Sequence, residues 1–210
     1  MLIFGFNGGT NLAHEDVFDL DAGQSHDSAA VLVDDGRVVA GIEQERLDRI
    51  KHSNKLPIDA IRFCLDSYGV RADEVDAFVY YTSKPTMDFR LKQNCLKRNL
   101  TRQSGPRGPQ FARAEEFFSH VLSTELGRPV PADRIRFVRH HVAHLVSALA
   151  CSGFERSLLL SIDGVGEGES GRVAVGEGES IETVRVFGAD ASLGHFYTWA
   201  IRHIGFRMFD

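Results

Sequence analysis

The sequence predicts a mixed α/β fold, because short apolar runs alternate along the chain with longer amphipathic segments. The short runs span about four to eight residues and end at glycine-containing turns, which is typical of strands. The longer segments carry apolar residues about three and four positions apart, which is typical of helices that bury one face. With 210 residues, the chain is long enough to build one sizeable hydrophobic core.

The first part of the chain reads as a strand, a β-hairpin, a helix and a second strand, at residues 2–6, 28–46, 57–70 and 75–81. The hairpin is indicated by Asp35 and Gly36 between two apolar runs, since Asp-Gly is among the strongest short hairpin signals. Pro57 suits the start of the helix, and Gly69 suits its end.

The rest of the chain reads first as two helices (86–100 and 111–127) around a glycine- and proline-rich loop (103–110). A strand (134–139) and a helix (141–153) come next. Three strands (156–163, 171–178 and 181–188) and a final helix (192–205) follow. An opening strand, a hairpin and two helix-linked strands is the element order of the actin-like (ribonuclease H-like) superfamily, which includes sugar kinases and Hsp70. We therefore expect a mixed sheet with flanking helices. In that superfamily, glycine turns after strands hold phosphates between two related halves.

Composition excludes several classes of protein. The net charge of −5 argues against generic binding to nucleic acid or anionic membranes, and the basic segment 90–113 reads as a solvated surface. No apolar run approaches the roughly 20 residues that span a bilayer, and the N-terminus lacks the features of a signal peptide. Cys64, Cys95 and Cys151 have no close spacing, and Cys64 and Cys151 are expected to be buried thiols, so a cytoplasmic location is predicted.

Histidines at the front of the predicted helix 141–153 suggest a metal site. His140 and His144 are four positions apart, so their imidazoles can face one point, whereas His141 points about 100° away. Asp163 ends an apolar strand, where ligands bind in α/β folds. Two histidines and one carboxylate leave coordination positions open for catalysis, and iron(II), zinc and manganese are all chemically suitable. The alternative is a plain polar helix start.

Glycines after Asp163 suggest a phosphate-binding turn. Gly164 and Gly166 permit a tight backbone with accessible amide groups, which a phosphate can approach. The alternative is an ordinary turn between two strands. The same two readings apply to Gly8 and Gly9 after the first strand.

A third set of candidates surrounds the hairpin. His26 precedes the first hairpin strand, where it could donate to an oxyanion or phosphate, or shuttle a proton. The alternative is an inert loop histidine. A basic run follows the hairpin: Arg46, Arg49, Lys51, His52 and Lys55. We expect most of these side chains to be solvated. The more specific alternative is that one lysine binds a phosphate.

Four separated motifs resemble one known family. "FGFNG…HDSAAVLVDDGRVVAGIEQERLDRIKH", "RHHVAHLVSAL", "LSIDGVGE" and "SLGHFYTWAIRHIGF" are similar to the N-terminal part of the O-carbamoyltransferases of antibiotic and nodulation-factor biosynthesis. The resemblance runs in order over nearly the whole chain. It implies a large domain like the tRNA threonylcarbamoyl-transfer protein, followed by a smaller domain that makes carbamoyl-adenylate from the co-substrates ATP and carbamoyl phosphate. The large domain then passes the carbamoyl group to a hydroxyl of a small natural product.

The resemblance also implies roles for individual residues. A metal, usually iron(II), would be held by His140, His144 and Asp163, with a fourth ligand, an aspartate, beyond residue 210. The metal would polarise the carbamoyl carbonyl or hold the phosphate. Carbamoyl-adenylate would be bound by His26, the catalytic candidate, and by Lys51, with its phosphate on Gly164 and Gly166.

Two departures from the family pattern stand out. Residues 10–24 lengthen the path to "HDSAA", and we expect a surface loop there in preference to part of an acceptor pocket. The chain also stops at Asp210, where the family continues. Residues 1–210 are therefore expected to be the first part of the large domain, truncated, with the second half-domain and the adenylate-forming domain absent, and inactive alone. The alternative functions are a relative acting on tRNA or another phosphorylated ligand, and a non-catalytic binding or scaffold module.

Overall fold

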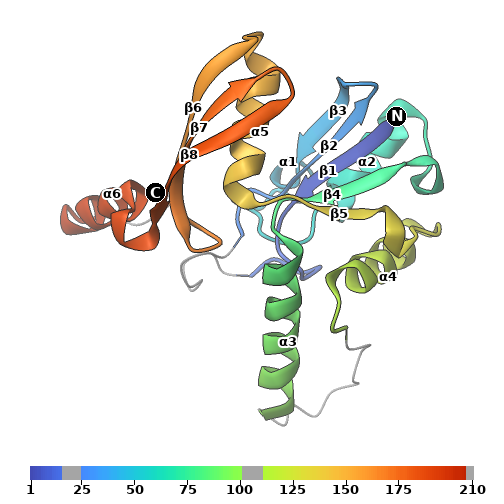
Figure 1. The fold of residues 1–210 in the computed structure, drawn as a ribbon. Coiled ribbons are helices and arrows are strands. Elements are labelled where there is room, and N and C mark those ends of the chain that lie inside the picture. The colour runs from blue at the N-terminus through green and yellow to red at the C-terminus, as the bar shows by residue number, and fades with distance from the viewer. Residues whose placement is uncertain (16–24, 101–110, 207–210) are drawn as a thin grey trace. The chain divides into compact units, whose positions relative to one another are not determined.

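The computed structural model describes residues 1–15, 25–100 and 111–206, with backbone only for 94–100 (Figure 1). The described residues before Arg139 form one compact unit, and those from Arg139 onward form a second. The predicted loop 103–110 and much of the segment 10–24 lie outside the described residues. No helix in the described parts of the chain is long and apolar enough to cross a membrane.

The first unit contains a five-stranded mixed sheet with the strand order β3-β2-β1-β4-β5. Its strands are β1 (Leu2–Asn7), β2 (Ala29–Asp34), β3 (Arg37–Glu43), β4 (Ala77–Tyr80) and β5 (Ile135–Phe137). The first three form an antiparallel meander, and β4 and β5 add in parallel beside β1. Asp35 and Gly36 both have positive φ at the hairpin turn, as an Asp-Gly turn requires. An opening strand, a hairpin and two helix-linked strands are therefore confirmed, and with them the mixed α/β class.

The helices of the first unit are α1 (Glu45–Asp48), α2 (Ile58–Tyr68), α3 (Lys84–Leu100) and α4 (Ala114–Leu126). Helix α2 ends at Gly69, whose φ of 74° only glycine adopts without strain. Phe4 and Phe78 stack in the core with ring centroids 5.7 Å apart, and Phe118 packs edge-on against Phe6. Cys64 is fully buried among these apolar side chains, as predicted.

The second unit contains a three-stranded antiparallel sheet, β6 (Arg156–Gly166), β7 (Glu169–Glu177) and β8 (Ser180–Gly188), and two helices, α5 (His140–Ser152) and α6 (Leu193–His203). The repeated sequence "GEGES" forms the two hairpin turns, at residues 167–168 and 178–179. Strand β6 is longer than predicted, because it continues past Asp163 to Gly166. The β6–β7 pairing is irregular between Ile162 and Gly166, so this last part is a bulged extension.

Helix α5 packs on one face of this sheet through a small core. Leu145 contacts Leu159 and Ala174, and a Cβ atom on Gly176 would lie 2.9 Å from the Leu149 side chain, so that glycine permits the close approach. Cys151 is exposed, which corrects the expectation that it is buried. Two positions beyond Leu149, it is turned about 200° around the helix and faces away from the sheet.

The second unit also exposes apolar side chains. Leu158, Leu160 and Ile162 alternate along β6 and are 74%, 59% and 56% exposed. Helix α6 and the residue that follows it expose a further set: Leu193, Phe196, Tyr197, Trp199 and Ile204. Exposed apolar surfaces of this kind mark interaction sites or ligand-binding surfaces.

Candidate functional site

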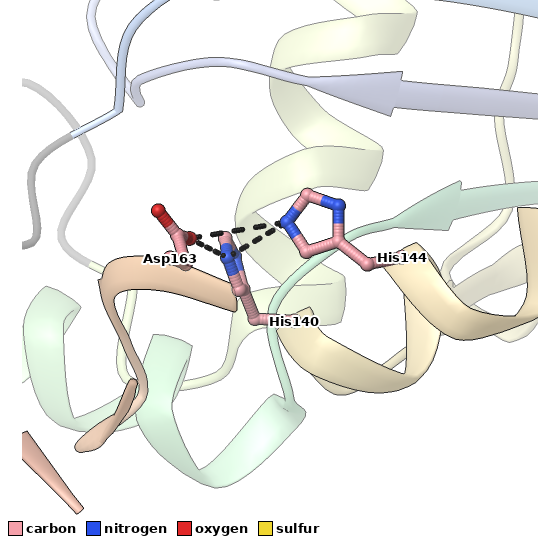
Figure 2. Close-up of side chains that lie close together, drawn as sticks. All are labelled: His140, His144 and Asp163. Carbon is pink, nitrogen blue, oxygen red and sulfur yellow. Dashed lines mark hydrogen bonds and ion pairs between the residues drawn. The ribbon is translucent and has the colours of Figure 1, made fainter. Parts of the chain in front are cut away.

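The first turn of α5 and the bulged end of β6 bring together three side chains that could hold a metal ion, in the second unit (Figure 2). The Nε2 atom of His140 lies 2.6 Å from Oδ2 of Asp163 and 3.1 Å from Nε2 of His144. The Nε2 atom of His144 lies 3.9 Å from the same Asp163 oxygen. The two imidazoles, one helical turn apart, therefore face one carboxylate, which is the geometry that the sequence predicts.

Asp163 is held in place by the backbone around it. Its Oδ1 atom accepts a hydrogen bond from the amide of Gly164 at 2.6 Å, which leaves Oδ2 toward the histidines. Ser192, the N-cap of α6, donates its hydroxyl to the carbonyl of Gly164 at 2.6 Å. The bulge and the helix start together fix the direction of the carboxylate.

His140 is placed by a side chain and by a glycine. Its amide donates to Oε2 of Glu167 at 2.7 Å, which satisfies one of the N–H groups at the helix start. Its ring lies against Gly166, where an added Cβ atom would fall 2.1 Å from Cδ2 of His140. Only a glycine at position 166 leaves room for the imidazole.

His141 has a structural role. It is buried, with Nε2 donating to the carbonyl of Glu169 at 2.9 Å, so that Nδ1 accepts from the hydroxyl of Ser161 at 3.0 Å. Both ring nitrogens are used inside the unit. As predicted, His141 is not part of the group formed by His140, His144 and Asp163, although its ring centroid lies 5.1 Å from that of His140.

The electrostatics of the site favour a cation. The neighbouring His140, and after it His144, hold the pKa of the Asp163 carboxyl far below its ordinary value, so the carboxylate is ionised at neutral pH. A single proton on Nε2 of His140 cannot donate a full hydrogen bond both to Oδ2 of Asp163 and to Nε2 of His144. A metal with ligands at about 2.0–2.2 Å separates its donor atoms by about 3.3 Å. The observed separations of 2.6, 3.1 and 3.9 Å bracket that value, so the three donors fit a divalent metal.

The two glycines after Asp163 lie within β6, and the turn itself falls at Glu167 and Gly168, both with positive φ. In this structure the amide of Gly164 donates to Asp163, and Gly166 makes room for His140. The hairpin between two strands is the plainer of the two readings weighed from sequence. A phosphate-binding role for Gly164 and Gly166 stays a prediction.

Gly8 and Gly9, the other candidate phosphate turn, pack against backbone in the first unit. A Cβ atom on Gly8 would lie 2.6 Å from the carbonyl oxygen of Lys55, and one on Gly9 would lie 2.3 Å from that of Asn54. The amide of Gly9 donates to the Asn54 carbonyl at 2.8 Å. These glycines therefore allow the segment before α2 to cross close to the end of β1.

His26 and Lys51 both lie in the first unit, on separate loops. His26 is exposed just before β2, and its Nδ1 atom lies 2.6 Å from Oδ2 of Asp27. Lys51 is exposed between two residues in the left-handed region, Arg49 with φ of 61° and His52 with φ of 56°. Non-glycine residues rarely adopt this conformation, and such strain is concentrated at functional sites.

The strained segment is anchored by Asp48. Its carboxylate, only 7% exposed, accepts from the hydroxyl of Ser53 at 2.7 Å and the amide of Ile50 at 2.9 Å, and pairs with Lys55 at 3.3 Å. In the predicted basic run, Lys55 and Arg46 are thus paired with carboxylates, Arg46 with Glu43 at 3.1 Å.

Asp48 should make the first unit sensitive to acid. Burial raises the pKa of its carboxyl, but hydrogen bonds from Ser53, Ile50 and Lys55 outweigh this and hold the pKa below 3.8. Because the folded pKa is depressed, the stabilisation is present above pH 4 and lost as the pH falls. We expect Asp48→Asn to lower the free energy of unfolding by about 1–3 kcal/mol at pH 7 and by much less at pH 3.

Urea unfolding followed by circular dichroism at the two pH values would measure this difference. Asp66→Asn, at an exposed position on α2, is the matched control and should change little at either pH. An effect of Asp48→Asn that is equal at pH 7 and pH 3 would contradict the assignment.

Sequence reasoning missed a second cluster of metal-ligating groups in the first unit, formed by Asp27, Glu45 and His52. Asp27 belongs to the quoted "HDSAA" motif, and Glu45 and His52 belong to "EQERLDRIKH". The signal was therefore present as residue types. Their separation of up to 25 positions gave no sign that they would meet.

The fold and the converging side chains define a mixed α/β protein with a candidate divalent-metal centre in its second unit. A family described as "Carbamoyltransferase N-terminus" matches residues 22–209, and the chain belongs to this family.

The chain is also similar to individual known proteins. The chain is 42% identical over 210 residues to "Nodulation protein NolNO" of Sinorhizobium fredii, covering all of this chain and 30% of that protein. It is 41% identical over 137 residues to the "Uncharacterized 19.2 kDa protein in syrM 5'region" of Rhizobium etli, covering 65% of this chain and 78% of that one. Among solved structures, it is similar to YeaZ from Pseudomonas aeruginosa, with a TM-score of 0.38 and 16% identity over 89% of this chain and 64% of that chain. The chain thus spans less than a third of the NolNO protein.

Proposed function

We propose that this chain is the N-terminal part of an O-carbamoyltransferase that moves a carbamoyl group from carbamoyl-adenylate to a hydroxyl of a small natural product. The observation that carries the proposal is the convergence of His140, His144 and Asp163, in a chain of the carbamoyltransferase family, on a point suited to a divalent metal. Further polypeptide, as in the longer NolNO protein, would supply the fourth ligand and the formation of carbamoyl-adenylate from ATP and carbamoyl phosphate.

The family resemblance assigns a role to residues in each unit. His140, His144 and Asp163 would hold the metal, iron(II) by preference. A bound divalent metal supplies Lewis-acid polarisation of the carbamoyl carbonyl, or a counter-charge for the phosphate. In the first unit, Lys51 would contribute a positive charge to the adenylate phosphate, and His26 would bind the carbamoyl-adenylate and handle the proton of the acceptor hydroxyl.

A chimera tests this function. This chain would replace the segment of NolNO with which it aligns, and the product would be incubated with ATP, radiolabelled carbamoyl phosphate and a panel of alcohols. We expect a carbamate product, and we expect His144→Ala to abolish it while pyrophosphate release persists. His203→Ala, an exposed histidine on α6, is the control and should retain activity.

Other outcomes separate the alternatives. Pyrophosphate release by the unsubstituted chimera without any carbamoylated alcohol would contradict the proposal. Carbamoylation of added tRNA in place of the alcohols would identify a nucleic-acid-modifying relative. Transfer that is unchanged in His144→Ala would exclude the metal centre from the reaction.

A further inference from the structure

Asp27 lies between two imidazoles in the first unit. Its Oδ2 atom is 2.6 Å from Nδ1 of His26, and its Oδ1 atom is 2.7 Å from Nδ1 of His52. One carboxylate therefore contacts the Nδ1 atom of each of two histidines that are 26 positions apart in the sequence.

The chemistry of these contacts fixes the position of two protons. An ionised carboxylate can only accept hydrogen bonds, so both Nδ1 atoms must donate. Burial raises the pKa of the Asp27 carboxyl, but hydrogen bonds from His52 and His26 outweigh this and lower it, so the group is ionised at neutral pH. A neutral imidazole that carries its proton on Nδ1 has its lone pair on Nε2.

The backbone holds both ends of this arrangement in a costly conformation. Asp27 has φ of 52° and His52 has φ of 56°, in the left-handed region. The carbonyl of Asp27 accepts from Nδ2 of Asn7 at 3.0 Å, and the amide of His52 donates to Oε2 of Glu45 at 2.9 Å. Hydrogen bonds that hold both Asp27 and His52 in strained backbone conformations indicate a functional constraint.

We propose that Asp27 is a positioning residue that holds His26 and His52 together as Nδ1–H tautomers, so that each ring has its basic lone pair on Nε2. The consequence for catalysis rests on the function proposed above. The acceptor O–H bond would break with its proton passing to Nε2 of His26, the hydroxyl oxygen would bond to the carbamoyl carbon, and the carbon–oxygen bond to AMP would break, so that AMP leaves with the electron pair. Asp27 itself touches no substrate in this scheme.

A cation on Asp27, Glu45 and His52 is the competing reading, because their ligand atoms lie within 4.8 Å of one another. A metal bound through Nδ1 of His52 would remove the proton that this nitrogen donates to Asp27 at 2.7 Å. It also draws on the Glu45 carboxylate, whose Oε2 atom accepts from the His52 amide. The present contacts therefore favour the hydrogen-bonded arrangement.

Side-chain ¹⁵N NMR of the histidines in this chain reads the tautomers directly, without any assay of activity. We expect His26 and His52 to be Nδ1-protonated, against the usual preference of imidazole for Nε2–H. In Asp27→Asn the side chain offers one acceptor and one donor, so one of the two rings should switch to the Nε2–H tautomer. In Asp27→Ala both should switch.

The control is Asp35→Asn, which alters another left-handed aspartate (φ of 45°) at the β2–β3 turn and should leave both tautomers unchanged. Nε2–H tautomers at His26 and His52 in the unsubstituted chain would overturn the proposal. So would tautomers that do not respond to either Asp27 substitution, or loss of the Nδ1 proton of His52 on adding Zn²⁺ or Mn²⁺. If the NMR confirms the tautomers but the chimera is inactive, Asp27 remains a positioning residue. The carbamoyl-transfer function is then the proposal that fails.

Discussion

Gly166→Ala is expected to weaken divalent-metal binding by at least about 10–100-fold, although it adds only one methyl group. The added Cβ atom would lie 2.1 Å from Cδ2 and 2.4 Å from Cγ of His140, closer than any real contact between such atoms. The His140 ring must turn away, and its Nε2 atom then leaves Asp163. Titration calorimetry of the purified chain with Zn²⁺ or Mn²⁺ would measure the loss.

Gly164→Ala is the matched control two positions away on the same strand. A Cβ atom there would meet only the ring of His195, at 3.7 and 3.8 Å, which is an ordinary van der Waals contact. We expect this variant to bind metal within a few-fold of the unsubstituted chain. If both variants lost metal affinity equally, the cause would be the backbone of residues 164–166 and not the space that Gly166 leaves for the His140 ring.

His144→Ala is expected to remove most of the metal that copurifies with the chain, and Asp163→Asn should do the same. Each variant takes away one of three donor groups, and such a loss exceeds the about 10–100-fold effect typical of residues that merely support a ligand. His144 is 55% exposed, so its replacement should leave the free energy of unfolding nearly unchanged.

Elemental analysis of protein purified without chelators would check this prediction, with His203→Ala as the control. We expect about one equivalent of metal in the unsubstituted chain and in the control. No metal above background in any of the proteins would contradict the prediction and favour a non-catalytic binding or scaffold module.

The sequence could predict the parts of this site that depend on local geometry. The spacing of His140 and His144 determines that both face one side of α5, and it equally separates His141 from them. The Asp-Gly hairpin and the helix stop at Gly69 were predictable for the same reason, since they depend on the conformations that a few adjacent residues allow.

Contacts between distant residues were not predictable from these patterns. The steric role of Gly166 appears only when β6 lies beside the first turn of α5, and the Asp27–His52 contact joins two loops that are 25 positions apart. Cys151 on helix α5 is a further example. An apolar pattern indicates which residues could be buried, but the face of the helix that is buried depends on where the sheet packs, and Cys151 is exposed.

The site also connects two elements far apart in the chain. His140 begins α5, and Asp163, 23 positions later, lies in the bulge of β6. A cation held by both would act as a reversible cross-link that exists only in the folded second unit, and at 100 times its Kd it would stabilise that state by about 2.7 kcal/mol. The thermal midpoint of this unit would then rise with the free metal concentration, so the folded fraction of the second unit would depend on metal supply.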